Sequence, residues 1–395
     1  MLDKILFKLS SLSLGAHRAF NRWARRRPGF KPYLLDYAPN PSNKKIIHVI
    51  GNFIVGGSTQ LVVDLIERTS DEFYHEVVVP QPEVPLFYQP VEIHPFSISE
   101  LRELRDFLRA EAPELVHIHY FVRENDKFTE GALWYEAVFK ICEDLGLKVI
   151  QNVNVPTSPY PSPAVIHNVF VSQYVERVFN NVEAPSSVVY PGSDFSHFRN
   201  EEVDALPEKS VGMVYRLDSD KLRADAIEVF IEATKLDPEL RSYIVGGGSF
   251  LDAFRSRVRA EGLENRISLT GFISYYELPA IYRKFSIFAA PVHDESFGQV
   301  TPFAMSMGHC VAGYDTGAIS ELLQSTDTLV PTGDFKALAE TIVDLANDPA
   351  KRRIIGKRNQ QIAKARFSVE EMIRQYRELY REHLVAPQTL TSNAR

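Results

Sequence analysis

The residues best suited to chemistry lie in residues 295–308, which read Glu-Ser-Phe-Gly-Gln-Val-Thr-Pro-Phe-Ala-Met-Ser-Met-Gly. A carboxylate, Glu295, precedes a glycine, Gly298, and a run that predicts a helix. A helix start presents N–H groups without internal partners and a partial positive charge, so it attracts phosphate. A carboxylate just ahead of it can hold sugar hydroxyls. The combination is what a sugar linked to a nucleoside diphosphate requires.

A basic pair earlier in the chain completes this pattern. Arg216 follows a predicted strand, and Lys221 is predicted to begin the next helix. Two fixed cations at a strand end can neutralise a leaving diphosphate, as a metal ion does in other transferases. A solvated surface pair is the alternative. We expect both residues at the carboxyl edge of a sheet, on the same side as the Glu295 turn, which favours a functional role.

The composition is that of a globular protein with two domains. The chain has 395 residues, of which 45% are hydrophobic and 24% are charged. Its two cysteines, Cys142 and Cys310, lie too far apart in sequence for a metal-binding motif, and they indicate a reducing cytosol. No apolar run is long enough to span a bilayer. These features predict a cytoplasmic protein.

The net charge of -7 hides an asymmetry. Residues 1–31 contain eight Lys or Arg and one acidic residue, a balance of +7, so the remainder carries -7 minus +7, or -14. An acidic body argues against nucleic acid as a partner. The apolar residues of 1–23 recur at helical spacing, which predicts an amphipathic helix. Contact with an anionic membrane surface through residues 1–31 and packing of this helix on the protein both remain open.

Predicted strands and helices alternate along both halves of the chain. In the first half, strands are predicted at 46–50, 77–79, 115–119, 148–153 and 165–171, with helices near 61–66 and 101–110. In the second half, strands are predicted at 210–215, 242–245, 267–269 and 287–290, with helices from about Leu222 and through 254–258. A polar stretch at 200–210 reads as a linker, and 369–384 as a long final helix. This alternation predicts two parallel α/β domains with a cleft between them.

From about residue 165 to 385 the chain resembles the retaining glycosyltransferases of the GT-B superfamily, family 4. The segments that carry the resemblance are Val214-Tyr-Arg216-Leu with Lys221, Ile244-Val-Gly-Gly-Gly248, Leu269-Thr-Gly271-Phe-Ile, Pro291-Val-His-Asp-Glu295-Ser-Phe-Gly298, Gly317 with Glu321, Asp334 with its helix, and Phe367-Ser to Tyr380. Before residue 165 the resemblance is weaker and consists of Gly56-Gly57, Leu115-Val-His-Ile-His119 and Val189-Tyr-Pro-Gly-Ser-Asp194. Taken in order, these elements are specific, although no single one is.

The resemblance implies an α/β fold of GT-B architecture, in which two Rossmann-like domains face a central cleft and a C-terminal helix crosses back to the first domain. The boundaries expected are a basic amphipathic extension at 1–44, an acceptor domain at 45–205, a nucleotide-sugar donor domain at 206–365, a crossover helix at 366–385 and a disordered tail at 386–395.

The resemblance also implies roles for individual residues. Arg216 and Lys221 would bind the donor diphosphate, Glu295 the hydroxyls of the transferred sugar, and His119 would lie near the reacting carbon. His117, which we take to alternate with His119, is expected to face the core. The donor-binding set comprises Gly56, Gly57, Gly271, Phe272, Ile273, Ser296, Phe297, Gly298, Gln299, Val300 and Phe303. No cofactor and no metal are expected.

Three features depart from the family pattern. The family usually has a second Glu eight positions after the first, where this chain has Phe303, which cannot accept a hydrogen bond from ribose hydroxyls. A lost charge-assisted bond costs roughly 1.5–3 kcal/mol, or about ten- to hundredfold in affinity. Asn152 and Asn154 stand where relatives often carry a His. The pair Asp218 and Asp220 mimics a metal-binding D-x-D motif, but its place between Arg216 and Lys221 predicts a loop.

The sequence therefore predicts transfer of a sugar from a nucleoside-diphosphate donor to an acceptor hydroxyl, with retention of configuration and without a metal. The acceptor expected is a saccharide or a lipid-linked molecule in polysaccharide, lipopolysaccharide or glycolipid synthesis, and acceptor choice is placed in the loops at 121–130 and 156–163. Two alternatives remain open. One is a non-catalytic relative that binds a sugar nucleotide, and the other is a sugar-nucleotide epimerase of similar architecture.

Overall fold

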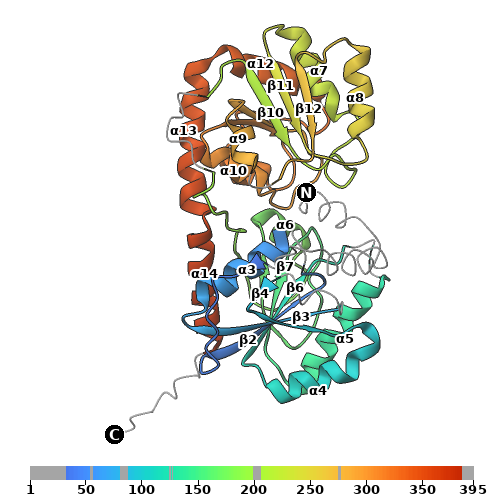
Figure 1. Ribbon diagram of the computed structural model, residues 1–395, viewed down its shortest axis with the longest axis vertical. Helices are drawn as coiled ribbons and strands as arrows, with labels where there is room; N and C mark the ends of the chain where they lie inside the picture. Colours follow the sequence, from blue (N-terminus) through green and yellow to red (C-terminus); the bar gives the residue numbers. More distant parts are fainter. Residues whose placement is uncertain are drawn as a thin grey trace, which may run out of the picture. The chain divides into compact units, whose positions relative to one another are not determined.

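A computed structural model describes residues 33–53, 57–80, 88–123, 126, 128–198, 206–274 and 277–384 (Figure 1). The chain divides into two compact units, and each is described by itself. The C-terminal unit comprises the described residues of 172–178 and 190–369. The N-terminal unit comprises those of 6–171, 179–189 and 370–395.

The N-terminal unit is built on a parallel sheet in which the described strands follow the order β5-β3-β2-β6-β7-β8-β9. The strands are β2 (Lys44–Ile50), β3 (Phe73–Val79), β5 (Glu92–Pro95), β6 (Leu115–Tyr120), β7 (Val149–Val153), β8 (Val165–Phe170) and β9 (Ser186–Val188). Two short strands, β1 (Tyr33–Leu34) and β4 (Tyr88–Gln89), pair with each other. The order reverses between β2 and β6, which makes the carboxyl ends of these two strands the switch point where ligands bind in open α/β sheets.

Helices cover this sheet because each has one apolar face. They are α3 (Gly57–Thr69), η1 (Ile98–Glu100), α4 (Leu101–Glu111), α5 (Glu130–Leu145), the end of α6 (Gln173–Phe179) and α14 (Val369–Leu384) from residue 370 onward. The strands β3 and β6 are buried at every position, as expected of a sheet covered on both faces. The core includes Trp134, Tyr135 and Phe139 of α5.

The C-terminal unit repeats this plan. Its described strands follow the order β12-β11-β10-β13-β14-β15, and all the pairs are parallel. The strands are β10 (Ser210–Val214), β11 (Arg241–Val245), β12 (Ile267–Gly271), β13 (Ile287–Ala290), β14 (Cys310–Tyr314) and β15 (Leu329–Val330). The switch point here lies between β10 and β13.

The helices of this unit pack on both sides of its sheet (Figure 1). They are α7 (Ala226–Leu236), α8 (Leu251–Ala260), α9 (Leu278–Tyr282), α10 (Val300–Ser306), α11 (Ile319–Leu323), α12 (Phe335–Asn347) and α13 (Pro349–Arg366). Residues Asp334 and Asp348 accept hydrogen bonds from the first-turn amides of α12 and α13, which explains where these two helices begin.

The predicted α/β class with two parallel sheets is confirmed, and the final helix has the predicted bounds of 369–384. The helix expected from about Leu222 begins only at Ala226, so the expectation that Lys221 begins that helix is wrong. Lys221 lies in the turn that precedes it. The domain boundaries expected from the sequence stay predictions. The basic segment 1–31, Gly56 and the tail from residue 386 lie outside the described residues.

Candidate functional site

The switch point of the C-terminal unit brings together the cations and the carboxylate that the sequence singled out. Arg216 lies two residues past the end of β10, and Glu295 lies five residues past the end of β13. The loops that follow the two strands are joined, because Leu222 bridges Val292 and the His293 amide donates to the Lys221 carbonyl at 3.2 Å. Parallel pairing of β10 with β13 thus places both loops at one edge.

Glu295 is held by an ion pair with Lys221. The Lys221 Nζ lies 2.8 Å from Glu295 Oε1. The Glu295 side chain is only 2% exposed, whereas that of Lys221 is 24% exposed. The other carboxylate oxygen, Oε2, is buried and has no hydrogen-bond partner among the described residues. A buried carboxylate oxygen without a partner is costly, so this atom is suited to accept a bond from a ligand hydroxyl.

Two glycines with positive φ enclose this carboxylate. Gly298 has φ 73°, and a Cβ added there would lie 2.7 Å from Glu295 Oε2. Gly317 has φ 55°, and its added Cβ would lie 2.2 Å from the Glu295 carbonyl oxygen, which accepts a hydrogen bond from the Ala318 amide at 2.9 Å. Any other residue at either position would both strain the backbone and displace Glu295.

Arg216 is more exposed and pairs with Asp220. The neighbouring Asp218 accepts a hydrogen bond from the Ser249 amide at 2.7 Å, so both carboxylates of the Asp218-Ser-Asp220 loop have protein partners. The glycine turn after β11 lies directly against this loop, since a Cβ on Gly246 would come within 1.8 Å of the Tyr215 carbonyl oxygen. The Asp218 and Asp220 carboxylates therefore shape the loop that presents Arg216.

The segment between Glu295 and α10 is tightly packed. Phe297 is buried between Tyr190 and Phe367, whose ring centroids lie 5.9 and 5.6 Å away. The Gln299 side chain donates to the Gly192 carbonyl at 3.3 Å, and the Val300 carbonyl accepts from the Tyr282 hydroxyl at 3.0 Å. Since α10 has seven residues, its dipole is short.

Phe303 takes part in the core of the C-terminal unit. It is 6% exposed, and its ring stacks on that of Phe198 with a centroid separation of 3.9 Å and an interplanar angle of 10°. The Ser306 hydroxyl donates toward the carbonyls of both residues. Phe303 therefore contributes to this core through burial of its apolar ring.

The remaining predicted residues lie at other strand or helix ends. Gly271 closes β12 with φ 70°, and its carbonyl accepts from the Gly246 amide at 3.0 Å, with Phe272 and Ile273 directly after it. Gly57 is the first residue of α3 in the N-terminal unit. Gly271 thus lies at the carboxyl end of β12 and Gly57 at the amino end of α3, and the roles expected of these residues stay predictions.

Glu321 was part of the predicted pattern without a role. Its Oε1 accepts from the Gln173 amide and the Tyr190 hydroxyl, both at 2.7 Å, and its Oε2 accepts from the Tyr174 amide at 2.9 Å. It therefore caps the first turn of α6. Arg366 donates to the same Tyr190 hydroxyl at 2.8 Å. These bonds join residues more than 130 positions apart, which sequence reasoning had no signal to pair.

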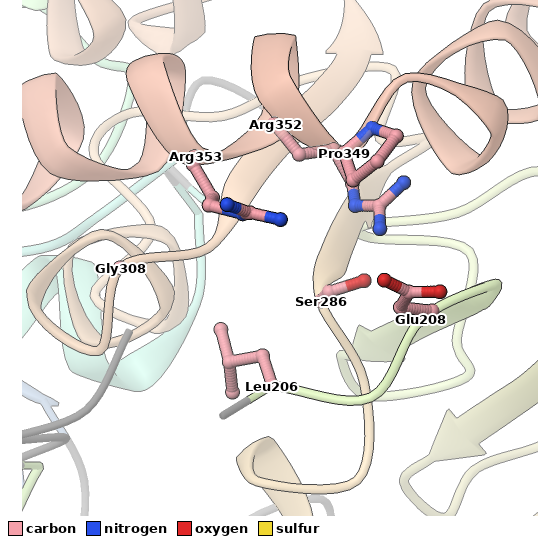
Figure 2. Close-up of a pocket in the computed structure, with 7 residues that line it drawn as sticks. All are labelled: Leu206, Glu208, Ser286, Gly308, Pro349, Arg352 and Arg353. Carbon is pink, nitrogen blue, oxygen red and sulfur yellow. The ribbon is translucent and has the colours of Figure 1, made fainter. Parts of the chain in front are cut away.

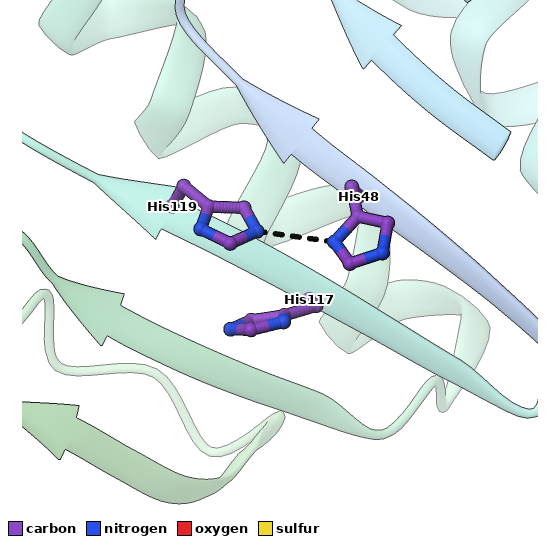
Figure 3. A group of neighbouring side chains, drawn as sticks. All are labelled: His48, His117 and His119. Atoms are coloured by element: carbon purple, nitrogen blue, oxygen red, sulfur yellow. Dashed lines mark hydrogen bonds between the residues drawn. The ribbon is translucent and has the colours of Figure 1, made fainter. Parts of the chain in front are cut away.

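In the N-terminal unit His119 lies near the carboxyl end of β6, at the switch point, but it is not alone. His48, His75, His117 and His119, the histidine cluster, are all 0% exposed. The rings of His117 and His119 lie 4.1 Å apart, and that of His48 lies within 5.4 Å of both (Figure 3). The prediction that His117 alternates with His119 is wrong, because residues two apart in a strand point to the same face.

Burial keeps the histidine cluster neutral. Desolvation lowers the pKa of His48 to about 3, and it lowers the pKa values of His75, His117 and His119 well below their usual value. The His117 Nδ1 lies 2.7 Å from the Tyr380 hydroxyl of α14. Sequence reasoning missed His48, although it is a polar residue within the apolar run at 46–50, and it missed His75, which precedes the strand predicted at 77–79 and is followed by Glu76.

Asn152 lies on β7 beside His119 in the strand register. It accepts a hydrogen bond from the Tyr376 hydroxyl of α14 and donates to the Asn154 side chain. Its polar atoms are thus engaged within the N-terminal unit, and the final helix is bonded to two neighbouring strands through His117 and Asn152.

A pocket in the C-terminal unit involves none of the predicted residues (Figure 2). It lies near the amino ends of β13 and β14, at the sheet edge opposite Glu295, and is lined by Leu206, Glu208, Ser286, Gly308, Pro349, Arg352 and Arg353. The Arg352 guanidinium donates to the carbonyls of Leu345 and Ala346, both at 2.6 Å, so it closes the end of α12. This gives Arg352 a structural explanation.

A comparison with known protein families finds a match that lies within the C-terminal unit. Residues 194–362 match the family model of the glycosyl transferases group 1. The matched region is less than half of the chain. Among curated relatives, the 2-deoxystreptamine N-acetyl-D-glucosaminyltransferase of Streptomyces fradiae is 31% identical over 28% of this chain and 27% of its own length. The lipopolysaccharide core mannosyltransferase LpcC of Rhizobium leguminosarum bv. viciae is 28% identical over 49% and 59%.

The chain thus spans less than two thirds of the length of these curated relatives. Among solved structures, Anabaena HepE in complex with UDP and glucose superposes with a TM-score of 0.67, at 18% identity, over 86% of this chain and 100% of that one. This likeness shows the fold, and it confirms the predicted GT-B fold class. Together the findings show a GT-B fold whose C-terminal unit is similar in sequence to glycosyltransferases. No helix among the described residues is long and apolar enough to cross a membrane.

Proposed function

We propose that the protein transfers a sugar from a nucleoside-diphosphate sugar to an acceptor hydroxyl, with retention of configuration, as a member of glycosyltransferase family 4. The observation that carries this proposal is the buried Glu295 carboxylate, which is held at a switch point by Lys221 and has one oxygen without a partner. A sugar ring presents the hydroxyl donors that this oxygen lacks.

In this mechanism the bond between the anomeric carbon and the donor diphosphate breaks as the acceptor oxygen bonds to that carbon. Arg216 and Lys221 neutralise the charge that develops on the leaving diphosphate, and the amides at 297–300 add hydrogen bonds to its oxygens. The proton of the acceptor hydroxyl passes to the departing phosphate. Gly271, Phe272 and Ile273 lie next to the nucleobase, and His119 binds near the reacting carbon. The two cations make a metal ion unnecessary.

The relatives suggest the class of acceptor. The Rhizobium leguminosarum relative is a lipopolysaccharide core mannosyltransferase, and the Streptomyces fradiae relative transfers N-acetylglucosamine to 2-deoxystreptamine. We infer a saccharide or lipid-linked acceptor in glycoconjugate synthesis, at the cytoplasmic side of a membrane. Surface contact through the basic residues 1–31 is part of this proposal, and their excess of seven positive charges supports it.

A donor screen tests the function directly. The purified protein is mixed with UDP- and GDP-sugars, and binding is detected as a rise in melting temperature. The donor that binds is then assayed for transfer and hydrolysis with EDTA present, and product stereochemistry is read by NMR. Arg216→Ala and Glu295→Gln should each lower kcat/KM at least tenfold with an unchanged circular dichroism spectrum, because a charge-assisted bond contributes roughly 1.5–3 kcal/mol.

Arg259 provides a matched control, since it is an exposed arginine whose nearest carboxylate, on Glu264, is 3.7 Å away. Arg259→Ala should leave kcat/KM unchanged. Normal turnover in Arg216→Ala would contradict the site. A second candidate is a non-catalytic sugar-nucleotide-binding protein, which the packing of Phe303 on Phe198 favours because no carboxylate can reach a ribose from that position. Tight binding without transfer or hydrolysis would support this alternative.

A further inference from the structure

The histidine cluster contains a continuous chain of hydrogen bonds that ends at His119. The His119 Nε2 lies 3.1 Å from His48 Nδ1 (Figure 3). The other nitrogen of His48, Nε2, lies 3.0 Å from His75 Nδ1, and His75 Nε2 lies 2.8 Å from the Thr69 hydroxyl. That hydroxyl donates to the Leu65 carbonyl at 2.7 Å. All five residues belong to the N-terminal unit.

The hydrogen bond between the Thr69 hydroxyl and the Leu65 carbonyl sets the direction of the other bonds in this series. A carbonyl can only accept, so the single hydroxyl proton of Thr69 points at Leu65. The reverse arrangement would set two oxygen lone pairs against each other at 2.7 Å. The Thr69 oxygen therefore accepts from His75 Nε2–H.

A neutral imidazole carries one proton, and its two nitrogens therefore take opposite roles. Since His75 is protonated on Nε2, its Nδ1 accepts from His48 Nε2–H. The Nδ1 of His48 then accepts from His119 Nε2–H. This assignment leaves the Nδ1 of His119 as a bare lone pair. It holds because burial keeps the rings of the cluster neutral.

The His119 Nδ1 has no hydrogen-bond partner among the described residues, although it is buried. The backbone around it is fixed, because the Tyr135 hydroxyl donates to the His119 carbonyl and accepts from the Gly51 amide, both at 2.7 Å. These bonds join the carboxyl ends of β2 and β6, so the lone pair lies at the switch point of this sheet.

We propose that Thr69, His75 and His48 are positioning residues that hold His119 with its proton on Nε2, so that Nδ1 accepts a hydrogen bond from a saccharide hydroxyl. This proposal rests on the proposed function for the identity of the ligand. An ionised phosphate oxygen can only accept a hydrogen bond, so it is excluded from this position. The fixed tautomer thus selects a sugar hydroxyl over a phosphate at His119.

The tautomer is measured on the free protein by two-bond ¹H–¹⁵N NMR with ¹⁵N-labelled histidine, and the His119 signals are assigned by their loss in His119→Gln. The wild type should show His119 protonated on Nε2. Thr69→Val keeps the shape of the side chain but removes the oxygen that orients the chain. With the hydroxyl gone, one direction of the hydrogen-bonded series leaves the His75 Nε2–H without a partner, and the other leaves the His119 Nδ1–H without one among the described residues. The two directions therefore become similar in energy, and His119 should show both tautomers.

Thr69→Ser is the conservative variant, since it keeps the hydroxyl. With the donor found by the screen, Thr69→Val should lower kcat in proportion to the fraction of His119 protonated on Nδ1, about twofold when half of the molecules carry that tautomer, with KM for the donor within twofold. Thr69→Ser should restore both the tautomer and kcat. A purely structural role would lower stability without changing the tautomer. The wild-type spectrum alone decides the direction of the chain if Thr69→Val does not fold.

Four results would overturn the proposal. They are a wild-type His119 protonated on Nδ1, an unchanged tautomer in Thr69→Val, a changed tautomer with unchanged kcat, and one bound zinc ion per chain that is lost in His48→Gln. Zinc binding matters because the ligand atoms of His48, His117 and His119 lie within 4.8 Å of one another. A bound metal would occupy the imidazole lone pairs that accept the hydrogen bonds of this series. If no sugar nucleotide binds, the proposed function fails while the tautomer result stands.

Discussion

Replacing Lys221 tests whether Glu295 depends on a single buried ion pair. At 2.8 Å, two unit charges interact by about 6 kcal/mol at an effective dielectric constant of ~20. Desolvation offsets part of this energy, but removal of one partner from a buried pair typically costs ~3–5 kcal/mol, because the other charge stays buried. Since Lys221 is 24% exposed, we expect Lys221→Met to lower the free energy of unfolding of the C-terminal unit by about 3 kcal/mol.

A double-mutant cycle isolates the interaction. Hydrogen exchange of β10 and β13, followed by mass spectrometry, gives the opening free energy of this unit by itself. Glu295→Gln should cost about 1–2 kcal/mol because the freed ammonium can turn to solvent, and the double variant should cost about 2 kcal/mol less than the sum of the two. Additive costs would refute the reasoning.

Lys235 is the matched control, since it pairs with Glu261 at 3.1 Å but is 42% exposed. Lys235→Met should cost less than about 1 kcal/mol, as expected for a surface pair. An equal loss in both lysine variants would mean that burial of Glu295 does not strengthen its pair with Lys221.

Three further outcomes are expected. Gly298→Ala should lower the melting temperature and the donor affinity more than Gly262→Ala does. The two glycines have similar positive φ, but only a Cβ at residue 298 would meet a carboxylate, at 2.7 Å. Equal effects of the two substitutions would exclude the clash. Phe303→Glu should lower the free energy of unfolding by about 3 kcal/mol and Phe303→Leu by about 1 kcal/mol, because the Glu variant places a charge where Phe303 stacks on Phe198. A smaller loss in Phe303→Glu than in Phe303→Leu would argue against this packing. Burial lowers the pKa of His48 to about 3 and the pKa values of the rest of the histidine cluster well below the usual ~6.5. The free energy of unfolding should therefore be highest above pH ~6.5 and should fall below that pH by up to about 1.4 kcal/mol per pH unit for each ring, because unfolding takes up protons. A flat profile from pH 6.5 to 5 in chemical denaturation would contradict this expectation.

The strands were predictable because buried parallel strands read as apolar runs. The run at 46–50 lies within β2, and that at 287–290 coincides with β13. The helix at 369–384 was also predictable from its apolar spacing. Long, periodic elements carry their own signal, whereas their ends depend on side chains that are distant in sequence.

The start of α7 shows why the ends are harder. Asp218 and Asp220 bond to the Ser249 amide and to Arg216, and these bonds favour a turn over an earlier helix start. The first of these partners comes from a separate strand–helix loop. The sequence therefore favoured a helix from Leu222, and the contact that delays it was not visible.

The candidate site was predictable as a set of residue types but not as a set of contacts. Glu295 and Lys221 are 74 positions apart, and no pattern shows that they pair directly. The role of Gly317 behind Glu295 was likewise hidden. His117 was expected on the opposite face of its strand from His119, but residues two apart in a strand point to the same face, so the two-residue period of a strand would have predicted its position.

The bonds of α14 have a consequence for biosynthesis. Tyr376 reaches Asn152 across 224 positions, and Tyr380 reaches His117 across 263. While the chain is still being made on the ribosome, His117 and Asn152 lack these two partners, which emerge only after the whole C-terminal unit. The second unit to be translated can therefore be the first to reach its native state, and a nascent chain stopped before residue 370 would keep His117 and Asn152 without their tyrosine partners.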